Sequence, residues 1–463
     1  MVNGSECQLA YDLRTTADGG AEADAERTFD LTLHCLDRLN ELVAPRASDL
    51  GAVALTSFWH SLLGLDGDGE PATPVFLWAD KRSGPDVGAL KEELDEHAIH
   101  ATTGCVPHSS YWPAKLRWLR RVHPATASSV RHWVSFADLL ALRFHGELVT
   151  TVSMASGTGL LDVHRAEWLD ELLDRLDLRR DALPRLVDRT DPLPPLTAAY
   201  ARRWPNLAGV PWLPSIGDGA TANVGAGCVT PDQLALTIGT SGAMRVIKRC
   251  DTFAVPADAW CYRLDRERIV LGGALSNGGN VAAWIAEKHG DGDFDGLTAR
   301  AATLEPDGHG LTVLPFLAGE RSPSWNDEAT GTIHGLTLTT DQADLFRAAL
   351  EAIAYRFAGI YDALADIAGA EHVIHANGAA ILRSPLWLQI IADTLNHPVV
   401  ALREEAEASA RGTAICALDA IGARNDLSPP LPIDATYLPD TDRHRRYAAA
   451  RHRQRRLELA LYP

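Results

Sequence analysis

One aspartate in the middle of this sequence has surroundings that suit a catalytic base. Asp218 stands between Gly217 and Gly219, in the run of small residues GDGATANVGAG. A carboxylate there can accept the proton of a substrate hydroxyl while that hydroxyl attacks a phosphoryl group. Because Asp-Gly pairs are also common in turns, a purely structural turn is the alternative interpretation.

A nearby stretch, TIGTSGAMR, has residues suited to holding a phosphate. Leu234–Ile238 and Ala243–Ile247 have the pattern of two strands, which Gly239–Gly242 joins as a turn. The glycines let backbone N–H groups approach an anion closely, and the hydroxyl groups of Thr240 and Ser241 add further donors. The alternative is a tight hairpin that binds nothing.

A second pair of glycines, Gly278 and Gly279, comes directly before the helix-like segment NVAAWIAEKH. Backbone N–H groups at a helix N-terminus attract anions. This point is therefore another candidate for contact with a phosphate.

The elements that must position these residues alternate along the chain. Short β-type runs alternate with longer helix-type segments, which is the pattern of an α/β fold with a parallel or mixed sheet. The clearest helix begins near Asp344, where apolar residues recur at steps of three and four up to Leu364. The predicted strands are Val53–Ser57, Val75–Trp78, Leu234–Ile238, Met244–Ile247, Leu311–Leu317, Val373–Ala376 and Val399–Leu402.

Two segments rich in proline, glycine and small residues divide this series. DPLPPL at Asp191–Leu196 and PSIGDGATANVGAGC at Pro214–Cys228 are predicted to be connections rather than element interiors. A chain of 463 residues is too long for one ordinary core, so two domains are expected. We expect them over residues 1–228 and 229–440, followed by a terminal surface helix over residues 441–463.

Composition excludes several classes of function. The formal net charge of −18 argues against a general nucleic-acid binder, which holds phosphates with surplus lysine and arginine. No uninterrupted apolar run reaches the roughly 18 residues that cross a bilayer, and the first residues lack the basic and apolar regions of a signal peptide. We therefore expect a cytoplasmic protein with no nucleic-acid or membrane partner.

Taken together, the motifs resemble those of the FGGY family of carbohydrate kinases over nearly the whole chain. GDGATANVGAG and TIGTSGAMR are similar to the catalytic-aspartate segment and the second phosphate loop of that family. GTIHGLTLTTDQADLFRAALE, from Gly331 to Glu351, is similar to its C-terminal signature. Further segments follow at family spacing: GGALSNGGNVAAW, FLAGERSPSWNDEATGTIHGL, SPLWLQIIADTLNHPV and EAEASARGTAICAL. The resemblance implies a two-domain actin-like ATPase (ribonuclease H-like) fold with a cleft between the domains.

The resemblance also implies the reaction and the residues that carry it. Asp218 becomes the general base in phosphoryl transfer from ATP, with Mg²⁺ neutralising the phosphates and Asp218 acting on the metal only indirectly. The substrate is a small sugar or sugar acid, and a homodimer is compatible with the family. The nucleotide-binding residues implied are Gly239, Thr240, Ser241, Gly279, Gly378, Ala379 and Ser384.

Toward the N-terminus, TSFWHSLLGLD, FLWADKRS and GCVPHSSYWPAKLRWL resemble the substrate side of the family, nearest to its gluconate-kinase-like members. Arg82 and Lys115 are candidates to pair with a sugar-acid carboxylate, which a planar guanidinium fits with two hydrogen bonds. A surface ion pair is the alternative for both, and a core position is the alternative for the histidine and tryptophans. The substrate-side candidates are Trp59, His60, Trp78, Asp80, Arg82, Tyr111 and Gly219.

The sequence departs from the family pattern at two points. Family members begin with a strand–turn–strand that carries Asp-x-Gly-Thr-Ser, whereas the first match here, AYDLRTTADGGAEADAERTF, corresponds to a stretch further in. A start codon placed too late is the favoured explanation over a shortened protein, because losing two strands leaves an open sheet edge. The second departure is Ala379, where relatives carry a glycine and an added Cβ is expected to crowd the nucleotide or shift the loop.

These observations leave alternatives for the function. The first is an ATP-dependent kinase whose preferred acceptor is gluconate, with xylulose, ribulose or another pentose or polyol next. The second is a kinase relic that binds a sugar or nucleotide as a sensor, which the missing first hairpin favours. An actin-like structural or chaperone ATPase fits the fold but not the motifs HSLLGLD and WADKRS.

Overall fold

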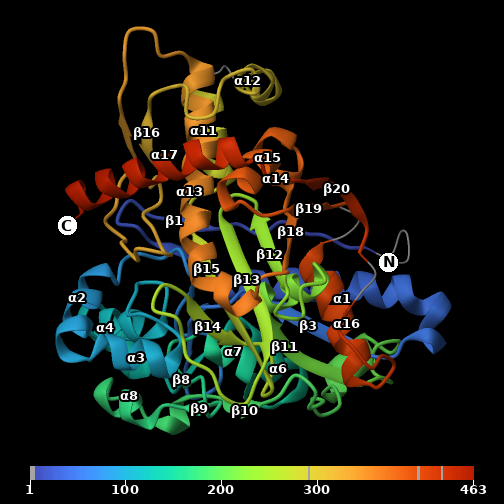
Figure 1. The fold of residues 1–463 in the computed structure, drawn as a ribbon. Helices are drawn as coiled ribbons and strands as arrows, with labels where there is room; N and C mark the ends of the chain where they lie inside the picture. The colour runs from blue at the N-terminus through green and yellow to red at the C-terminus, as the bar shows by residue number, and fades with distance from the viewer. Residues whose placement is uncertain (1–5, 290–291, 404–406, 429–430, 463) are drawn as a thin grey trace.

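The computed structural model describes residues 6–289, 292–403, 407–428 and 431–462, and its largest element is a seven-stranded mixed sheet (Figure 1). All seven strands come from the C-terminal half of the chain, so the predicted α/β class is observed. In spatial order they are β14 (Trp260–Arg263), β15 (Arg268–Leu275), β13 (Gly242–Arg249), β12 (Gln233–Ile238), β18 (Val373–Asn377), β19 (Val399–Leu402) and β20 (Ile433–Tyr437).

Helix α13 (Gln342–Ala368) covers this sheet and supplies much of its core. Asp341 caps its N-terminus and forms a capping box with Asp344, close to the predicted start. Its apolar face, which includes Phe346 and Leu350, packs into one buried cluster with strand residues of the sheet. The other helices of this half are α11 (Gly279–His289), α12 (Phe294–Ala301), α14 (Ala379–Leu382), α15 (Pro385–Leu395), α16 (Ala408–Ala420) and α17 (Thr441–Leu461).

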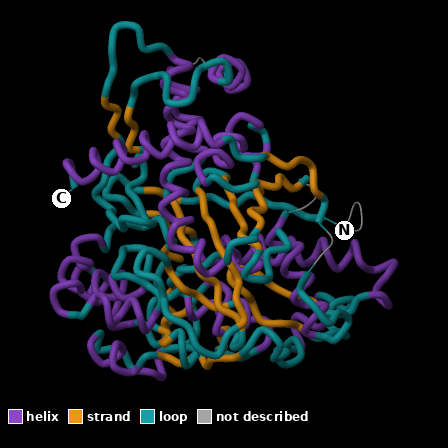
Figure 2. The backbone as a smooth tube through the Cα atoms, in the orientation of Figure 1, coloured by secondary structure: helices purple, strands orange, loops and turns teal. Residues whose placement is uncertain are grey.

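The N-terminal half is built from short sheets and many helices (Figure 2). Its central pair is β3 (Val53–Ser57) beside the parallel strand β11 (Trp212–Gly217), and among the described residues β3 has no second strand partner. The other strands are β1 (Arg14–Thr15), β2 (Ala21–Ala23), β4 (Leu63–Leu65), β5 (Val75–Phe76), β6 (His132–Val134), β7 (Val149–Thr151), β8 (Leu161–Asp162), β9 (Glu167–Trp168) and β10 (Arg185–Val187). The helices include α1 (Ala25–Val43), α2 (Gly84–Glu93), α3 (Glu96–Thr103), α4 (Trp112–Val122), α6 (Phe136–His145) and α7 (Val152–Ser156).

The prediction that Pro214–Cys228 is a connection is wrong. The segment forms most of the buried strand β11 and then helix α10 (Asp218–Gly225). Its small residues permit close helix packing instead of a loop: a Cβ on Gly225 would lie 1.9 Å from the Ala408 carbonyl oxygen of α16. In the other direction, a Cβ on Gly412 of α16 would lie 1.8 Å from the backbone carbonyl oxygen of Thr221 in α10. The glycines let the two helix backbones touch.

Strand direction brings distant residues to one place. In the parallel pair β3–β11, Ser57 lies opposite Gly217, so the chain after β3 runs beside Asp218. In the parallel pair β12–β18, Thr237 lies opposite Asn377, so two loops leave the large sheet at the same edge. A buried cluster joins both halves at this point, with members such as Trp59, Ile216, Ile247, Tyr262 and Ile415.

No helix in the described part of the chain is both long and apolar enough to cross a membrane. The segment Asp191–Leu196 has neither helix nor strand, as predicted for a connection. The strand predicted at Leu311–Leu317 is shorter, because β16 (Thr312–Leu314) ends before Pro315, which has no N–H to continue its pairing with β17 (Thr332–His334).

Candidate active site

Asp218 lies where β11 ends and α10 begins. Its Oδ1 accepts hydrogen bonds from the backbone N–H groups of Gly219, at 2.8 Å, and Trp59, at 3.4 Å. Both bonds end on the same carboxylate oxygen. The second oxygen, Oδ2, has no hydrogen-bond partner among the described residues. The carboxylate is therefore held in place by backbone on one side and open to a ligand on the other.

The surroundings of Asp218 favour its action as a base. Burial raises the pKa of Asp218 above its ordinary value, while the Arg245 guanidinium and the hydrogen bond from Gly219 act in the opposite direction. A carboxylate with a raised pKa is a stronger proton acceptor than one in water. The direction of the shift therefore suits proton transfer from a hydroxyl.

Trp59 explains the two glycines beside Asp218. A Cβ on Gly217 would lie 2.0 Å from Cε2 and Nε1 of the Trp59 indole, and a Cβ on Gly219 would lie 2.5 Å from its Cζ3. The indole is fixed because its Nε1–H donates to the Ser153 carbonyl at 2.9 Å. Glycine is needed on both sides of Asp218 because this ring lies against the backbone.

His60 and Tyr111 lie on the same wall as Trp59. The Nδ1–H of His60 donates to the Gly157 carbonyl at 2.5 Å, and burial lowers the pKa of His60 to about 3. The imidazole is therefore neutral near pH 7, with Nε2 as a hydrogen-bond acceptor. The hydroxyl of Tyr111 is 2.6 Å from the hydroxyl of Tyr262, which comes from β14 in the C-terminal half.

The predicted hairpin is observed, with Ile238 opposite Gly242 and the glycine–hydroxyl turn between them. The start of α11 supports this turn, because the N–H of Gly279 donates to the Gly239 carbonyl at 2.8 Å. That N–H is therefore occupied within the protein rather than turned toward a ligand. Among the described residues no group bonds to the hydroxyls of Thr240 and Ser241, which remain available to an anion.

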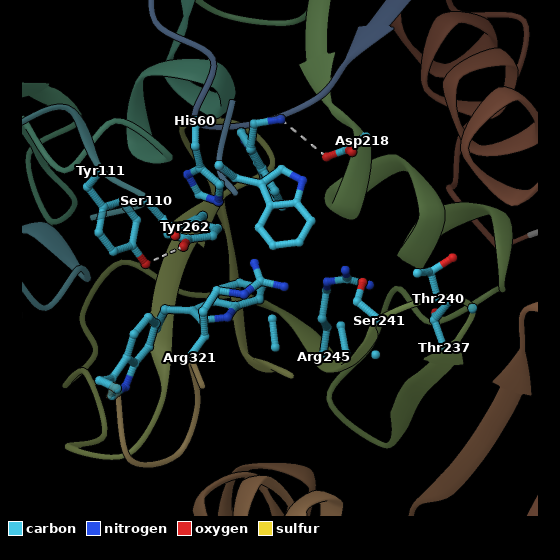
Figure 3. Close-up of a pocket in the computed structure, with 18 residues that line it drawn as sticks. His60, Ser110, Tyr111, Asp218, Thr237, Thr240, Ser241, Arg245, Tyr262 and Arg321 are labelled. Carbon is cyan, nitrogen blue, oxygen red and sulfur yellow. Dashed lines mark hydrogen bonds between the residues drawn. The ribbon is translucent and has the colours of Figure 1, made fainter. Parts of the chain in front are cut away.

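One cavity of about 280 Å³ joins these parts (Figure 3). It lies between the two halves and brings Asp218 and the turn together with four of the predicted substrate-side residues. Its walls are Trp59, His60, Trp78, Ser110, Tyr111, Asp218, Thr237, Gly239, Thr240, Ser241, Gly242, Ala243, Arg245, Trp260, Tyr262, Ala274, Arg321 and Trp325.

A smaller cavity of about 170 Å³ meets the first at Thr237, which lines both. Gly378 lines it, and a Cβ there would lie 2.6 Å from the Ile238 carbonyl oxygen. Ala379 and Ser384 do not line it. The Ala379 side chain is exposed at the first position of α14. Ser384 is buried and caps α15 by accepting from the Trp387 N–H.

The predicted substrate-side residues Asp80 and Arg82 do not line the cavity. Arg82 bonds to Asp80 at 2.5 Å and to Glu22 at 2.7 Å, forming an ion-pair network whose carboxylates are buried. Lys115 is also buried away from the cavity, where its ammonium group donates to the Ser109 carbonyl. The cations expected to meet a substrate carboxylate are therefore used for structure.

Two cations that sequence reasoning did not single out line the cavity instead. Arg245 lies on β13, two positions beyond Ala243, and strand alternation from the predicted turn places both side chains on one face. Arg321 follows Glu320 in a segment without regular structure, and no local pattern predicts where its side chain lies.

The donor set of the cavity fits a metal held mainly by a nucleotide. Among the described residues that line it, Asp218 is the only carboxylate, and Mg²⁺ in such sites takes one or two carboxylates together with phosphate oxygens and water. A separate cluster, Asp307, His309 and Glu351, has the spacing of metal ligands. Its Glu351 already pairs with Arg347 at 2.7 Å and with His309 at 3.0 Å.

Comparison with known proteins covers most of the chain. Residues 5–225 match the N-terminal domain of the FGGY family of carbohydrate kinases, and residues 234–421 match the C-terminal domain of the same family.

Individual relatives are similar over most of their own lengths. The chain is 29% identical to a gluconokinase of Bacillus subtilis (strain 168), over 89% of this chain and 82% of that protein. It is 28% identical to a xylulose kinase of Escherichia coli (strain K12), over 96% and 91% of the two chains. Among solved structures, gluconate kinase from Lactobacillus acidophilus superposes with a TM-score of 0.90 at 28% identity, covering 98% of this chain and 92% of that one.

Proposed function

Because the chain belongs to the FGGY family of carbohydrate kinases, with the two-domain α/β fold of the actin-like ATPases, we propose that it transfers the γ-phosphoryl group of ATP to a hydroxyl of a sugar acid, with gluconate preferred. One observation carries this proposal. The open oxygen of Asp218 and the hydroxyls of Thr240 and Ser241 face one cavity, so an acceptor hydroxyl and a phosphate can meet there.

In this mechanism the acceptor hydroxyl lies at Oδ2 of Asp218. The carboxylate takes the proton of that hydroxyl as its oxygen attacks the phosphorus, and the backbone bonds to Oδ1 hold the carboxylate in position. The turn donates hydrogen bonds to the phosphate oxygens and spreads their charge. Mg²⁺ bound to ATP would lie near Asp218 and would neutralise further phosphate charge.

The nucleotide is proposed to extend from the turn into the smaller cavity. Thr237 lies between the two cavities and lines both. At the edge of the second cavity, Gly378 has no side chain and so allows the Ile238 backbone to lie close to it. The acceptor then lies between residues 1–228 and the cavity wall that carries Arg245 and Arg321, and the nucleotide lies against residues 229–440. Closure of these two parts over the acceptor would exclude water, which protects ATP from hydrolysis.

The preference for gluconate is supported by the relatives and by the charge of the cavity. Two of the similar proteins carry the names gluconokinase and gluconate kinase, although a xylulose kinase is nearly as similar. Arg245 and Arg321 make the cavity wall cationic, which suits an acid better than a neutral pentose.

The proposal is tested by ADP release from Mg-ATP with a panel of sugars, polyols and sugar acids. We expect release that depends on gluconate, and we expect Asp218→Asn to lower kcat by about 100-fold or more while nucleotide binding persists. Sugar binding without ADP release from wild-type protein would support the sensor alternative. Equal loss of turnover and nucleotide binding in Asp218→Asn would point to misfolding, and turnover at the wild-type rate in this variant would contradict the role of Asp218 as a base.

A further inference from the structure

We infer that Arg245 and Arg321 together form a carboxylate-binding subsite in the acceptor half of the main cavity, and that this subsite selects acidic sugars over neutral polyols. The inference rests on the proposed function, because it identifies which part of the acceptor the cavity recognises. It is carried by the positions of the two guanidinium groups and by buried donors on each that have no partner among the described residues.

Arg245 has donors with nothing to bind. Its Nε and Nη1 atoms are buried and have no hydrogen-bond partner among the described residues. Burial lowers the pKa of Arg245 to about 10, while the Asp218 carboxylate acts in the opposite direction, so the group remains charged near pH 7. A buried charge without hydrogen bonds is costly, and a ligand anion would remove that cost.

The guanidinium of Arg321 is held by one aromatic contact and still has a donor without a partner among the described residues. Its guanidinium lies 4.4 Å from the centre of the Trp78 ring, a cation–π contact that orients its plane. Its Nε is buried without a partner in the described structure, and its Nη2 reaches the Leu275 carbonyl only at 3.4 Å. Figure 3 shows the guanidinium groups of Arg321 and Arg245 in the same cavity as Asp218.

The charge balance of the cavity favours an anionic ligand. Two arginines face one carboxylate, Asp218, among the described residues of the wall, and His60 is neutral. Planar guanidinium groups with free donors match the two oxygens of a carboxylate. Backbone and hydroxyl donors of the turn already suit a phosphate, and Arg321 lies instead beside Trp78 and Tyr111 on the acceptor side. A sugar acid can thus place its carboxylate at the arginines and a hydroxyl at Asp218.

The test measures binding, which does not require turnover. Isothermal titration of the full chain without nucleotide compares D-gluconate with D-glucitol, which has a neutral CH₂OH in place of the carboxylate. The variants are Arg245→Met, Arg321→Met and the control Arg249→Met, which removes an exposed arginine from the same strand, paired with Glu267. We expect each cavity variant to weaken gluconate binding by about 10- to 100-fold and glucitol binding much less, with no change in the control.

Equal weakening of both ligands, or none, would overturn the subsite. A third titration measures the binding of a non-hydrolysable ATP analogue with Mg²⁺. If the arginine variants bind this analogue more weakly and bind gluconate as before, the arginines contact a phosphate, and the carboxylate assignment is refuted. If a Met variant does not fold, Arg→Lys at the same position keeps the charge and should retain part of the preference for gluconate; a complete loss of preference there contradicts a charge-based subsite.

The same data separate this inference from the proposed reaction. Arginine-dependent gluconate binding without ADP release from any acceptor would support the subsite and remove the kinase proposal. ADP release with neutral sugars only, and no gluconate binding, would leave a kinase but overturn the subsite.

Discussion

Replacing Gly217 by alanine tests whether the position of the Trp59 indole determines the position of the Asp218 carboxylate. The added Cβ would lie 2.0 Å from two atoms of the Trp59 indole, far inside van der Waals contact. The indole must move by more than about 1 Å to relieve this overlap. It cannot do so easily, because its Nε1–H is bonded to Ser153 and its ring packs 4.9 Å from that of Tyr262.

The expected cost combines two terms. Overpacking of a filled core costs about 1–3 kcal/mol, and a lost buried hydrogen bond adds about 1 kcal/mol, so we expect about 2–4 kcal/mol less free energy of unfolding. Because the Trp59 backbone also bonds to Asp218, displacement of the indole should lower kcat/KM by about 100-fold. Urea denaturation and ADP release measure the two effects.

Gly209→Ala is the matched control, since a Cβ at Gly209 meets nothing within 4 Å and its stability should change by less than about 1 kcal/mol. Trp59→Leu in the Gly217→Ala background removes the ring that clashes, and the double variant should be more stable than the sum of the single effects predicts. Wild-type stability and activity in Gly217→Ala would refute the reasoning.

The remaining predictions concern the turn, His60 and pH. Thr240→Val should raise KM for ATP about 10-fold and leave gluconate binding unchanged, because it removes one phosphate donor; unchanged ATP kinetics would exclude Thr240 from the site. His60 has its folded pKa lowered from 6.5 to about 3, so the unfolded chain binds this proton first and stability is lost as pH falls from 6.5 toward 3. His60→Asn, which tolerates the local φ of 68°, should show a smaller loss of unfolding free energy over that range in acid denaturation, and an unchanged loss would contradict it. Activity should rise with pH as Asp218 loses its proton, with a midpoint above that of an ordinary aspartate; a pH profile with an ordinary midpoint would argue against the buried base.

The parts of the site that lie within one local motif could be predicted from the sequence. Asp218 and the turn at Thr240 and Ser241 were each identified from neighbouring residue types, and the structure brings them to one cavity. The predicted strand Val53–Ser57 is observed as β3, and the helix predicted to begin near Asp344 is observed as α13, whose apolar residues are buried.

Other features depend on partners that lie far away in the sequence. Arg82 and Asp80 have the residue types of a sugar-acid site, but Glu22, sixty residues away, completes an ion-pair network that uses the guanidinium. The sequence predicts a connection at the glycines of α10, because sequence alone does not distinguish a glycine that allows a turn from one that allows Ala408 to approach.

Contacts between residues far apart in the sequence also explain why Arg245 and Arg321, and not Arg82, line the cavity. A guanidinium near carboxylates forms ion pairs that neutralise its charge, which is the state of Arg82, whose Nε and Nη2 bond to Asp80 and Glu22. Arg245 and Arg321 face aromatic rings and a single carboxylate that must stay free to accept a proton, so their unmet donors are the ones available for recognition. A cation available to substrate in this cavity is therefore marked by the absence of a protein partner, and that property arises only when the two halves of the chain come together.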